Sequence, residues 1–260
     1  MVAQGTQHRA VAPGTATVQG LLLSNQQVIV IGGSSGMGQA TARAAVAAGA
    51  TVTLVSRSKE RLEQARAALD DAVATYALDM RQEADVARFF AEVPLFDHLV
   101  ISAGEMTDGI GPFLELPLGS ARAQVESRFW GPYLAARYGA PKIRADGSIT
   151  FFTGVIGEKV IPGASVPAAV HGALEGLARV LAVELAPTRV NVVSPGTVNT
   201  PLHGWMPDDQ RAAFFDGAAK ATTAGRVGQP EDIGRAVLSL LENPYITGIT
   251  LPVNGGAALM

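Results

Sequence analysis

The sequence alternates short apolar runs, often β-branched, with longer segments rich in Ala and Leu. The apolar runs occupy residues 28–31, 51–55, 73–78, 98–102, 148–152, 189–193 and 249–253. The helix-like segments occupy residues 37–49, 59–70, 82–92, 120–144, 167–186 and 231–242. Strands that are apolar almost throughout are typical of a parallel sheet covered by helices on both faces. We therefore predict a Rossmann-type α/β fold, a doubly wound parallel sheet that binds ligands at the carboxyl ends of its strands.

The composition fits one large domain and excludes several classes of function. The chain has 260 residues, 48% of them hydrophobic, and a formal net charge of −3. No linker or repeat divides it, so we predict a loosely ordered extension over residues 1–20 and a single domain over residues 21–260. The nearly balanced charge gives no reason to expect a nucleic-acid or membrane partner. The absence of cysteine excludes disulfides and thiolate catalysis.

The sequence carries no signal for export or for a metal site. Residues 1–20 lack the apolar core of a signal peptide, and no stretch approaches the length of a membrane span, so we expect a cytoplasmic protein. The four histidines lie far apart and show no metal-binding spacing, so we expect no metal.

A glycine-rich turn joins the first predicted strand to the first predicted helix. Residues 32–38 read Gly-Gly-Ser-Ser-Gly-Met-Gly. Glycines at this spacing allow a tight turn, close approach of the backbone to a pyrophosphate, and close packing of helix on strand. The amides at the start of the helix and the two serine hydroxyls can donate to phosphate. We predict a dinucleotide site that includes Gly32, Ser34, Ser35, Gly36, Met37 and Gly38.

The end of the second predicted strand favours a phosphorylated cofactor. A site for NAD usually carries an acidic residue there, which binds the ribose 2′-hydroxyl. This chain has no acid before Glu60, and Arg57, assisted by Ser58 and Lys59, can bind a 2′-phosphate. The alternative is a solvated basic start of a helix. We predict NADP(H) as the cofactor.

Several further motifs, in a fixed order, resemble the short-chain dehydrogenase/reductase family over about residues 24–257. After the glycine turn come Asp79-Met80, Ser102-Ala103-Gly104, RVNVVSPGTVNT at 189–200, GRVGQPED at 225–232, and TG…VNGG ending at 256. The resemblance implies further cofactor contacts from Asp79, Met80, Ala103, Gly104, His171, Pro195, Gly196, Val198 and Thr200. It also implies a homodimer or homotetramer formed through the long helices at 120–144 and 167–186.

The resemblance implies hydride transfer between a nicotinamide and a carbonyl or alcohol, with Asn, Ser, Tyr and Lys as the catalytic residues. In this chain the corresponding positions hold Arg128, Gly154, Pro167 and His171. The sequence therefore predicts an atypical member that lacks the family's catalytic residues. Pro167 suits the first turn of a helix. Thr153, next to Gly154, is the nearest hydroxyl, and we name Thr153, His171 and Arg128 as candidate catalytic residues.

Each candidate also has a structural interpretation. His171 could contact the nicotinamide ribose, donate a proton or pack as an uncharged ring. Thr153 is either a buried hydroxyl at the end of a strand or a donor to the substrate oxygen. A buried Arg128 needs a partner, which is either Glu105 or Glu158 or else a substrate carboxylate or carbonyl.

Three functions are compatible with these residues. The first, which we predict, is an NADP(H)-dependent oxidoreductase acting on a small carbonyl or alcohol by a non-standard active site. The others are an NADP(H)-binding sensor or regulatory protein and a non-redox enzyme on the same fold. By resemblance the segment 201–224 covers the substrate. An apolar substrate is suggested by its Leu202, Trp205, Met206, Phe214 and Phe215.

Overall fold

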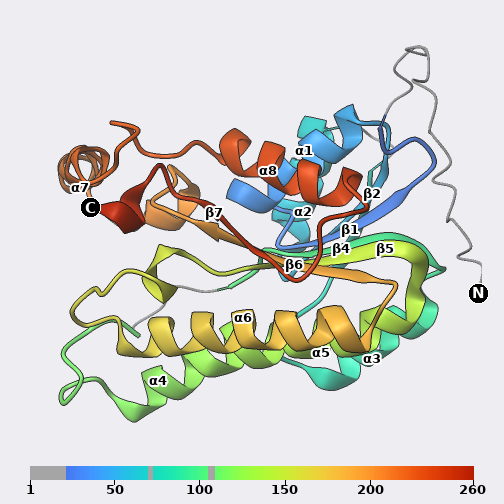
Figure 1. The fold of residues 1–260 in the computed structure, drawn as a ribbon, viewed down its shortest axis with the longest axis horizontal. Coiled ribbons are helices and arrows are strands. Elements are labelled where there is room, and N and C mark those ends of the chain that lie inside the picture. Colours follow the sequence, from blue (N-terminus) through green and yellow to red (C-terminus); the bar gives the residue numbers. More distant parts are fainter. Residues whose placement is uncertain (1–21, 70–72, 105–108) are drawn as a thin grey trace, which may run out of the picture.

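A parallel sheet forms the centre of the computed structural model (Figure 1). The structure describes residues 22–69, 73–104 and 109–260. Within them the strands are β1 (Gln27–Ile31), β2 (Thr51–Ser56), β3 (Ala74–Ala77), β4 (Phe96–Ile101), β5 (Ile143–Phe152), β6 (Arg189–Pro195) and β7 (Thr250–Val253). Their order is β3-β2-β1-β4-β5-β6-β7, and all neighbours are parallel. This confirms the predicted doubly wound sheet, while the predicted extension over residues 1–20 lies outside the described residues.

Helices cover both faces of the sheet, as Figure 1 shows. One face carries α1 (Gly36–Ala47), α2 (Lys59–Leu69) and α8 (Pro230–Glu242). The other carries α3 (Glu83–Glu92), α5 (Gly131–Gly139) and α6 (Ser165–Glu184). Within β1, Val28 and Val30 join the core on the first face, and Ile29 and Ile31 join the core on the second. Burial on both sides explains why the run Val28–Ile31 of β1 is apolar at every position.

The single helix predicted over residues 120–144 is wrong in detail. The chain instead forms α4 (Leu118–Val125), the π-helix η1 (Glu126–Trp130), α5 and the 3₁₀-helix η2 (Ala140–Lys142), and β5 begins directly afterwards. The Gly131 amide donates to the Glu126 carbonyl, five residues back. Pro132 follows, and it has no N–H to offer the carbonyl four residues before it. We attribute the wider turn to this proline.

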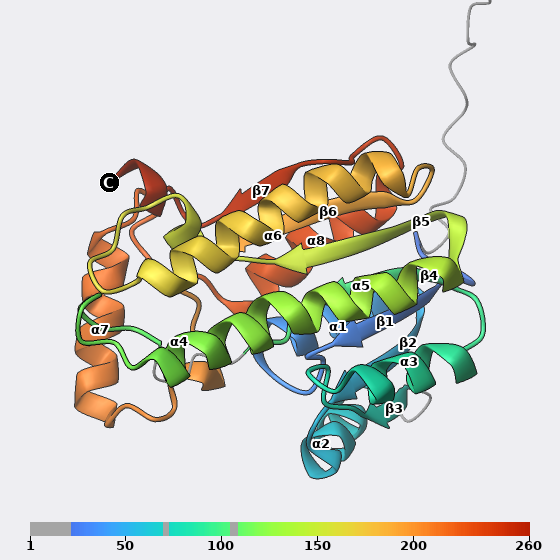
Figure 2. The ribbon, with the colours of Figure 1, turned by 90° about the horizontal axis from the view of Figure 1, so that it is seen from below.

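The segment 201–224 contains a helix that the sequence pattern did not reveal. It forms η4 (Pro201–His203) and α7 (Asp208–Lys220). No residue of α7 is buried, so the helix has no core-facing stripe that would show as a periodicity. In Figures 1 and 2, α7 lies beyond the end of the sheet, on the same side as the C-terminus. Two further 3₁₀-helices are η3 (Val155–Gly157) and η5 (Ala257–Leu259).

The helix α6 is the longest described helix, and it packs along β6. Among the described residues it is the one helix long and apolar enough to cross a membrane, by length and composition alone. Leu174 and Ala178 are buried against the sheet, as in a helix of a globular core. Its outer face is open, however, because Val180 and Val183 are 52% and 78% exposed. Figure 2 shows this helix running beside α4 and α5.

The strand order reverses between β1 and β4, and this reversal positions the site. The two strands pair directly, while the chain leads from β1 to β2 on one side and from β4 to β5 on the other. The loops that follow them therefore separate at the carboxyl edge of the sheet. An open parallel sheet binds its ligand in the crevice at such a point.

Candidate cofactor and substrate site

A cavity of about 680 Å³ opens at this reversal point. Among the predicted cofactor residues, it is lined by Gly32, Ser34, Ser35, Gly36, Met37, Gly38, Arg57, Ser58, Asp79, Met80, Ala103, Gly104 and Thr200. These residues come from loops that are far apart in the sequence but meet at one edge of the sheet. Outside this lining are His171, Pro195, Gly196 and Val198.

The glycine turn is shaped so that backbone, rather than side chains, borders the cavity. Gly32 has a φ of +91°, and a Cβ there would lie 2.6 Å from the Ala103 amide nitrogen. A Cβ on Gly38 would collide with the Gly32 carbonyl oxygen. Gly36 begins α1 with a φ of +54°. The N-terminus of α1 therefore meets the cavity with its amides unobstructed, which suits a pyrophosphate group.

Cationic and polar side chains gather at the end of the cavity formed by β2, α2 and the loop after β3. Arg57, Arg61, Gln64 and Arg81 all line it. Arg81 Nη2 lies 2.6 Å from Asp79 Oδ2, and this hydrogen bond lowers the pKa of the Asp79 carboxyl group. Three arginines thus border one part of the cavity, and guanidinium groups bind phosphate through strong charge-assisted hydrogen bonds.

Three of these lining residues were missed by the sequence argument. Arg61 and Gln64 lie one and two turns beyond Arg57, at the start of α2. Their spacing places them on the same side of the helix, and this signal could have been used. Arg81 has no such signal, because its place depends on the loop after β3.

Arg128 and His171, two of the predicted catalytic residues, contact each other next to Gly104 but are not among the residues that line the cavity. Arg128 Nη1 lies 3.1 Å from His171 Nε2, and His171 Nδ1 lies 3.3 Å from the Gly154 carbonyl oxygen. A carbonyl only accepts, so Nδ1 donates and Nε2 accepts from the guanidinium. A Cβ on Gly104, which lines the cavity, would lie 3.4 Å from Arg128 Cγ. The pair therefore borders the cavity from behind Gly104.

The electrostatics of this pair keep the ring uncharged. Burial, and after it the charge of Arg128, lower the pKa of His171 from 6.5 to about 4. Burial also lowers the pKa of Arg128, which still stays charged because a guanidinium does not deprotonate in proteins. Glu105, one of the two ion-pair partners expected for Arg128, lies outside the described residues. Glu158, the other, is exposed on the loop after η3.

Thr153, the third predicted catalytic residue, lies directly after β5. Its Oγ1 donates a hydrogen bond of 3.2 Å to Glu175 Oε1 on α6. Gly154 follows, and a Cβ there would lie 3.1 Å from His171 Cε1. Pro167 is the third residue of α6 and therefore lies in its first turn, as predicted. The end of β5 and the start of α6 thus bring His171 into contact with Gly154, the residue that follows Thr153.

An aromatic cluster holds together the segment 201–224, which the resemblance led us to expect over the substrate. The ring centroid of His203 lies 5.3 Å from that of Phe214 and 5.2 Å from that of Phe215. Leu202 lines the cavity, and Trp205 is 72% exposed beside it in the sequence. The apolar residues predicted for the substrate side therefore differ in what they do. Phe214 and Phe215 pack on His203 and so fix η4 to α7, whereas Trp205 is exposed.

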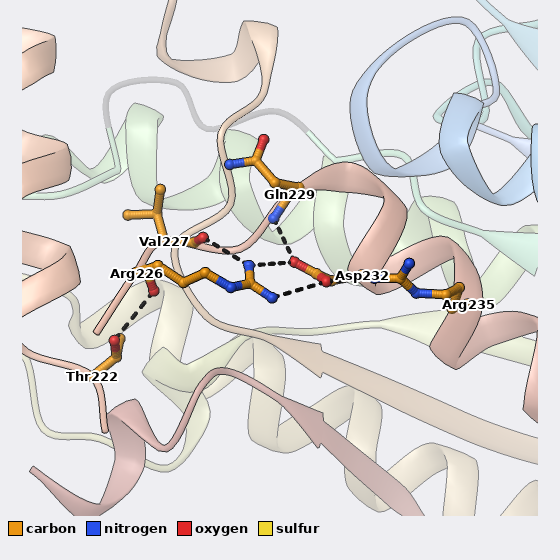
Figure 3. A network of polar contacts seen from close by, with 6 residues as sticks. All are labelled: Thr222, Arg226, Val227, Gln229, Asp232 and Arg235. Carbon is orange, nitrogen blue, oxygen red and sulfur yellow. Dashed lines mark hydrogen bonds and ion pairs between the residues drawn. The ribbon is translucent and has the colours of Figure 1, made fainter. Parts of the chain in front are cut away.

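A second cavity, of about 330 Å³, lies beside the start of α8 and is lined by Gly196 among others. Figure 3 shows the polar network that borders it. Asp232 accepts from both Arg226 Nη1 and Nη2, at 2.6 and 3.0 Å, and from the Gln229 amide at 2.8 Å. Arg235 adds a fourth contact, and the Arg226 hydrogen bond lowers the pKa of Asp232 strongly. This network caps α8 and so organises the loop that leads into it.

Comparison with known proteins agrees with this geometry. Residues 31–258 match a family model described as "Enoyl-(Acyl carrier protein) reductase". The short-chain dehydrogenase/reductase ATR9 of Stachybotrys chlorohalonatus is 34% identical over 91% of this chain and 98% of its own. A crystal structure of a small-chain dehydrogenase in complex with NADPH has a TM-score of 0.79 and 31% identity over 90% of this chain and 99% of that chain. The MalC reductase/Diels-Alderase of Malbranchea aurantiaca has a TM-score of 0.84 and 30% identity over 92% of this chain and 98% of that chain. The protein whose crevice is described above belongs to the short-chain dehydrogenase/reductase family.

Proposed function

We propose that this protein is an NADP(H)-dependent oxidoreductase that acts on a small carbonyl or alcohol through a non-standard active site. The observation that carries the proposal is the 680 Å³ cavity, which has bare backbone at one end and Arg57, Arg61 and Arg81 at another. A related dehydrogenase of the same fold was solved in complex with NADPH. The glycine turn would hold the pyrophosphate, and the guanidinium groups would hold the 2′-phosphate.

The non-standard part of the site is the pair of Arg128 and His171. When bound, NADPH supplies a hydride to the carbonyl carbon of the substrate. Arg128 keeps a positive charge next to Gly104, a residue of the cavity lining, and from there it would favour negative charge developing on the substrate oxygen. His171 holds that guanidinium through Nε2 and is itself held by the Gly154 carbonyl. In this arrangement His171 orients the cation, and Thr153 offers its hydroxyl to the substrate.

The test is to measure NADPH binding by fluorescence and NADPH oxidation with a panel of aldehydes and ketones. We expect binding and turnover in the wild-type protein. Arg128→Met should lower kcat while NADPH still binds, and it should raise the pKa of His171, followed by NMR, because the neighbouring charge is gone. Arg122→Met, which changes an exposed arginine on α4, is the matched control. Tight NADPH binding without turnover on any substrate would contradict the proposal and favour a regulatory role.

A second candidate function rests on one relative, which is described as both a reductase and a Diels-Alderase. A fold that serves both reactions makes a non-redox activity on this chain a specific alternative. The same assay separates the two. A substrate consumed without oxidation of NADPH would favour the second function.

We further propose an apolar substrate and assembly into a homodimer or homotetramer. The apolar residues Leu202 and Trp205 on the covering segment support the first proposal. The exposed Val180 and Val183 on α6 support the second, because an outward apolar stripe on a long helix is favourably buried by a second copy.

A further inference from the structure

A carboxyl group of α6 reaches the end of β5 at the site. Glu175 lies one helical turn after His171, and its Oε1 accepts the hydrogen bond from Thr153 Oγ1 at 3.2 Å. A Cβ on Gly157 would lie 3.3 Å from Glu175 Oε1 and 3.1 Å from His171 Cβ. The turn η3 therefore covers one stripe of α6 that contains both residues, and the absence of a side chain at Gly157 leaves room for them.

The proton required for a carbonyl reduction has to come from a group other than Arg128 or His171. Arg128 stays charged, and His171 is uncharged with its one N–H bonded to the Gly154 carbonyl. The hydroxyl of Thr153 can pass a proton on only if another group replaces that proton. Glu175 is the acid in contact with this hydroxyl.

We propose that Glu175 supplies, through the Thr153 hydroxyl, the proton that the substrate oxygen takes up during reduction. This inference rests on the proposed oxidoreductase function. The carbonyl carbon accepts the hydride that NADPH supplies, the π electrons of the C=O bond move to oxygen, and that oxygen takes the Thr153 proton. For this transfer the protonated Glu175 donates to Thr153 Oγ1, the reverse of the sense in which the hydroxyl donates to the carboxylate, so that the Thr153 proton is free for the substrate. Thr153 takes the proton of Glu175 as it gives up its own, and water reprotonates the partly exposed carboxylate. The products are the alcohol and NADP⁺, and alcohol oxidation runs the same transfers in reverse.

The surroundings of Glu175 suit a group that has to carry a proton. Burial raises its pKa, and the nearby charge of Glu158 raises it further, while the Thr153 hydrogen bond and Arg179 act in the opposite direction. The charged and titratable groups around it are therefore Glu158 on the loop after η3, and Arg179 and His171 on its own helix. A carboxyl group with a raised pKa keeps its proton closer to neutral pH, where an acid is needed.

The first experiment measures the pH dependence of kcat for NADPH oxidation. In the wild-type protein we expect kcat to fall as pH rises through the pKa of Glu175. Glu175→Gln should lower kcat about 100-fold, abolish this decline and leave NADPH binding unchanged. Thr153→Val should behave in the same way, whereas Thr153→Ser, which keeps the hydroxyl, should retain the rate.

Two exposed neighbours give a sharper test that does not alter the proton route. Glu158→Gln removes a negative neighbour, so it should lower the pKa of Glu175 and move the decline of kcat to lower pH. Arg179→Gln removes a positive neighbour and should move the decline to higher pH. The side chains of both residues are at the surface, so the fold should be unaffected.

A readout without turnover is the carboxyl ¹³C titration of Glu175 in the protein alone. We expect a pKa above the ordinary range of Glu, and a lower one in Glu158→Gln. Ordinary titration of Glu175 would overturn the inference. The inference would also be overturned if the pH at which kcat declines were the same in Glu158→Gln and Arg179→Gln as in the wild type. If the wild type turns over substrate and Glu175→Gln has the same kcat, the proton route is overturned but the proposed function stands. Absence of turnover by the wild type on every carbonyl overturns the proposed function, and the proton route with it.

Discussion

At the scale of single residues, the arrangement of hydrogen-bond partners decides what each titratable side chain can do. His171 and His98 are both buried, yet their partners differ. His171 lies between the Arg128 guanidinium and the Gly154 carbonyl. His98 lies inside the sheet, where Nδ1 is 2.8 Å from Ser148 Oγ and Nε2 is 2.6 Å from Gln26 Oε1. The amide oxygen only accepts, so Nε2 carries the proton and the ring is uncharged.

His98 therefore predicts how stability depends on pH. Burial lowers its pKa from 6.5 to about 4 in the folded protein, so between these values the unfolded chain binds a proton that the folded chain does not. Its contribution is complete above the unfolded pKa and is lost as pH falls toward the folded one. We expect the protonation of His98 in the unfolded chain to reduce the free energy of unfolding by about 2 kcal/mol when the pH is lowered from 7 to 5. Urea denaturation at the two pH values measures this. His98→Gln should lose less stability on acidification, and an equal loss would contradict the assignment.

The position of Arg57 leads us to predict that the protein prefers NADPH to NADH. It lines the cavity directly after β2, with no acidic residue before Glu60. Arg57→Ala should weaken NADPH binding by about 1.5–3 kcal/mol, since a charge-assisted hydrogen bond is lost, and should leave NADH binding nearly unchanged. Titration of cofactor fluorescence gives both dissociation constants. Equal weakening for the two cofactors would show that Arg57 does not contact the 2′-phosphate.

At the scale of elements, helix ends and breaks place the functional groups. The π-helix η1 turns Arg128 toward His171, and the proline that follows it accounts for the break. At α8 a capping box ties Gln229 to Asp232, and Arg226 completes the network (Figure 3). Both the break at η1 and the cap of α8 involve backbone groups at the end of a helix, so each sets the position of the chain segment that adjoins it.

Asp232 is expected to be the most sensitive position of this network. Asp232→Ala removes the acceptor for the Gln229 amide and for Arg226 together, so we expect a loss of about 1–2 kcal/mol in unfolding free energy. Thermal unfolding followed by circular dichroism measures the loss. Asp216→Asn is the control, because it breaks an exposed pair with Lys220 and should change little. If the two variants lost the same stability, the capping role of Asp232 would be wrong.

At the scale of the whole molecule, the outer face of α6 is the clearest candidate for assembly. Val180 and Val183 are 52% and 78% exposed, although α6 is otherwise packed on the sheet. A double change of Val180→Glu and Val183→Glu should convert the proposed dimer or tetramer to monomers. Light scattering after size-exclusion chromatography measures the mass. Leu95→Glu, at a position that is also 52% exposed but outside α6, should leave the mass unchanged. A wild-type protein that is already monomeric would refute the proposal.

The sequence by itself determined the fold class and the cofactor end of the crevice. Apolar strands alternating with helices permit few arrangements, and the spacing of the glycines predicts a phosphate-binding turn from local chemistry alone. Tertiary structure decided the rest. Arg128 and His171 are 43 residues apart, and Thr153 and Glu175 are 22 apart, so only packing reveals their hydrogen bonds. Local pattern reports what one segment can form. The charge state of a buried ring and the partner of a hydroxyl depend on neighbours from other segments, because burial and hydrogen bonding both act through space.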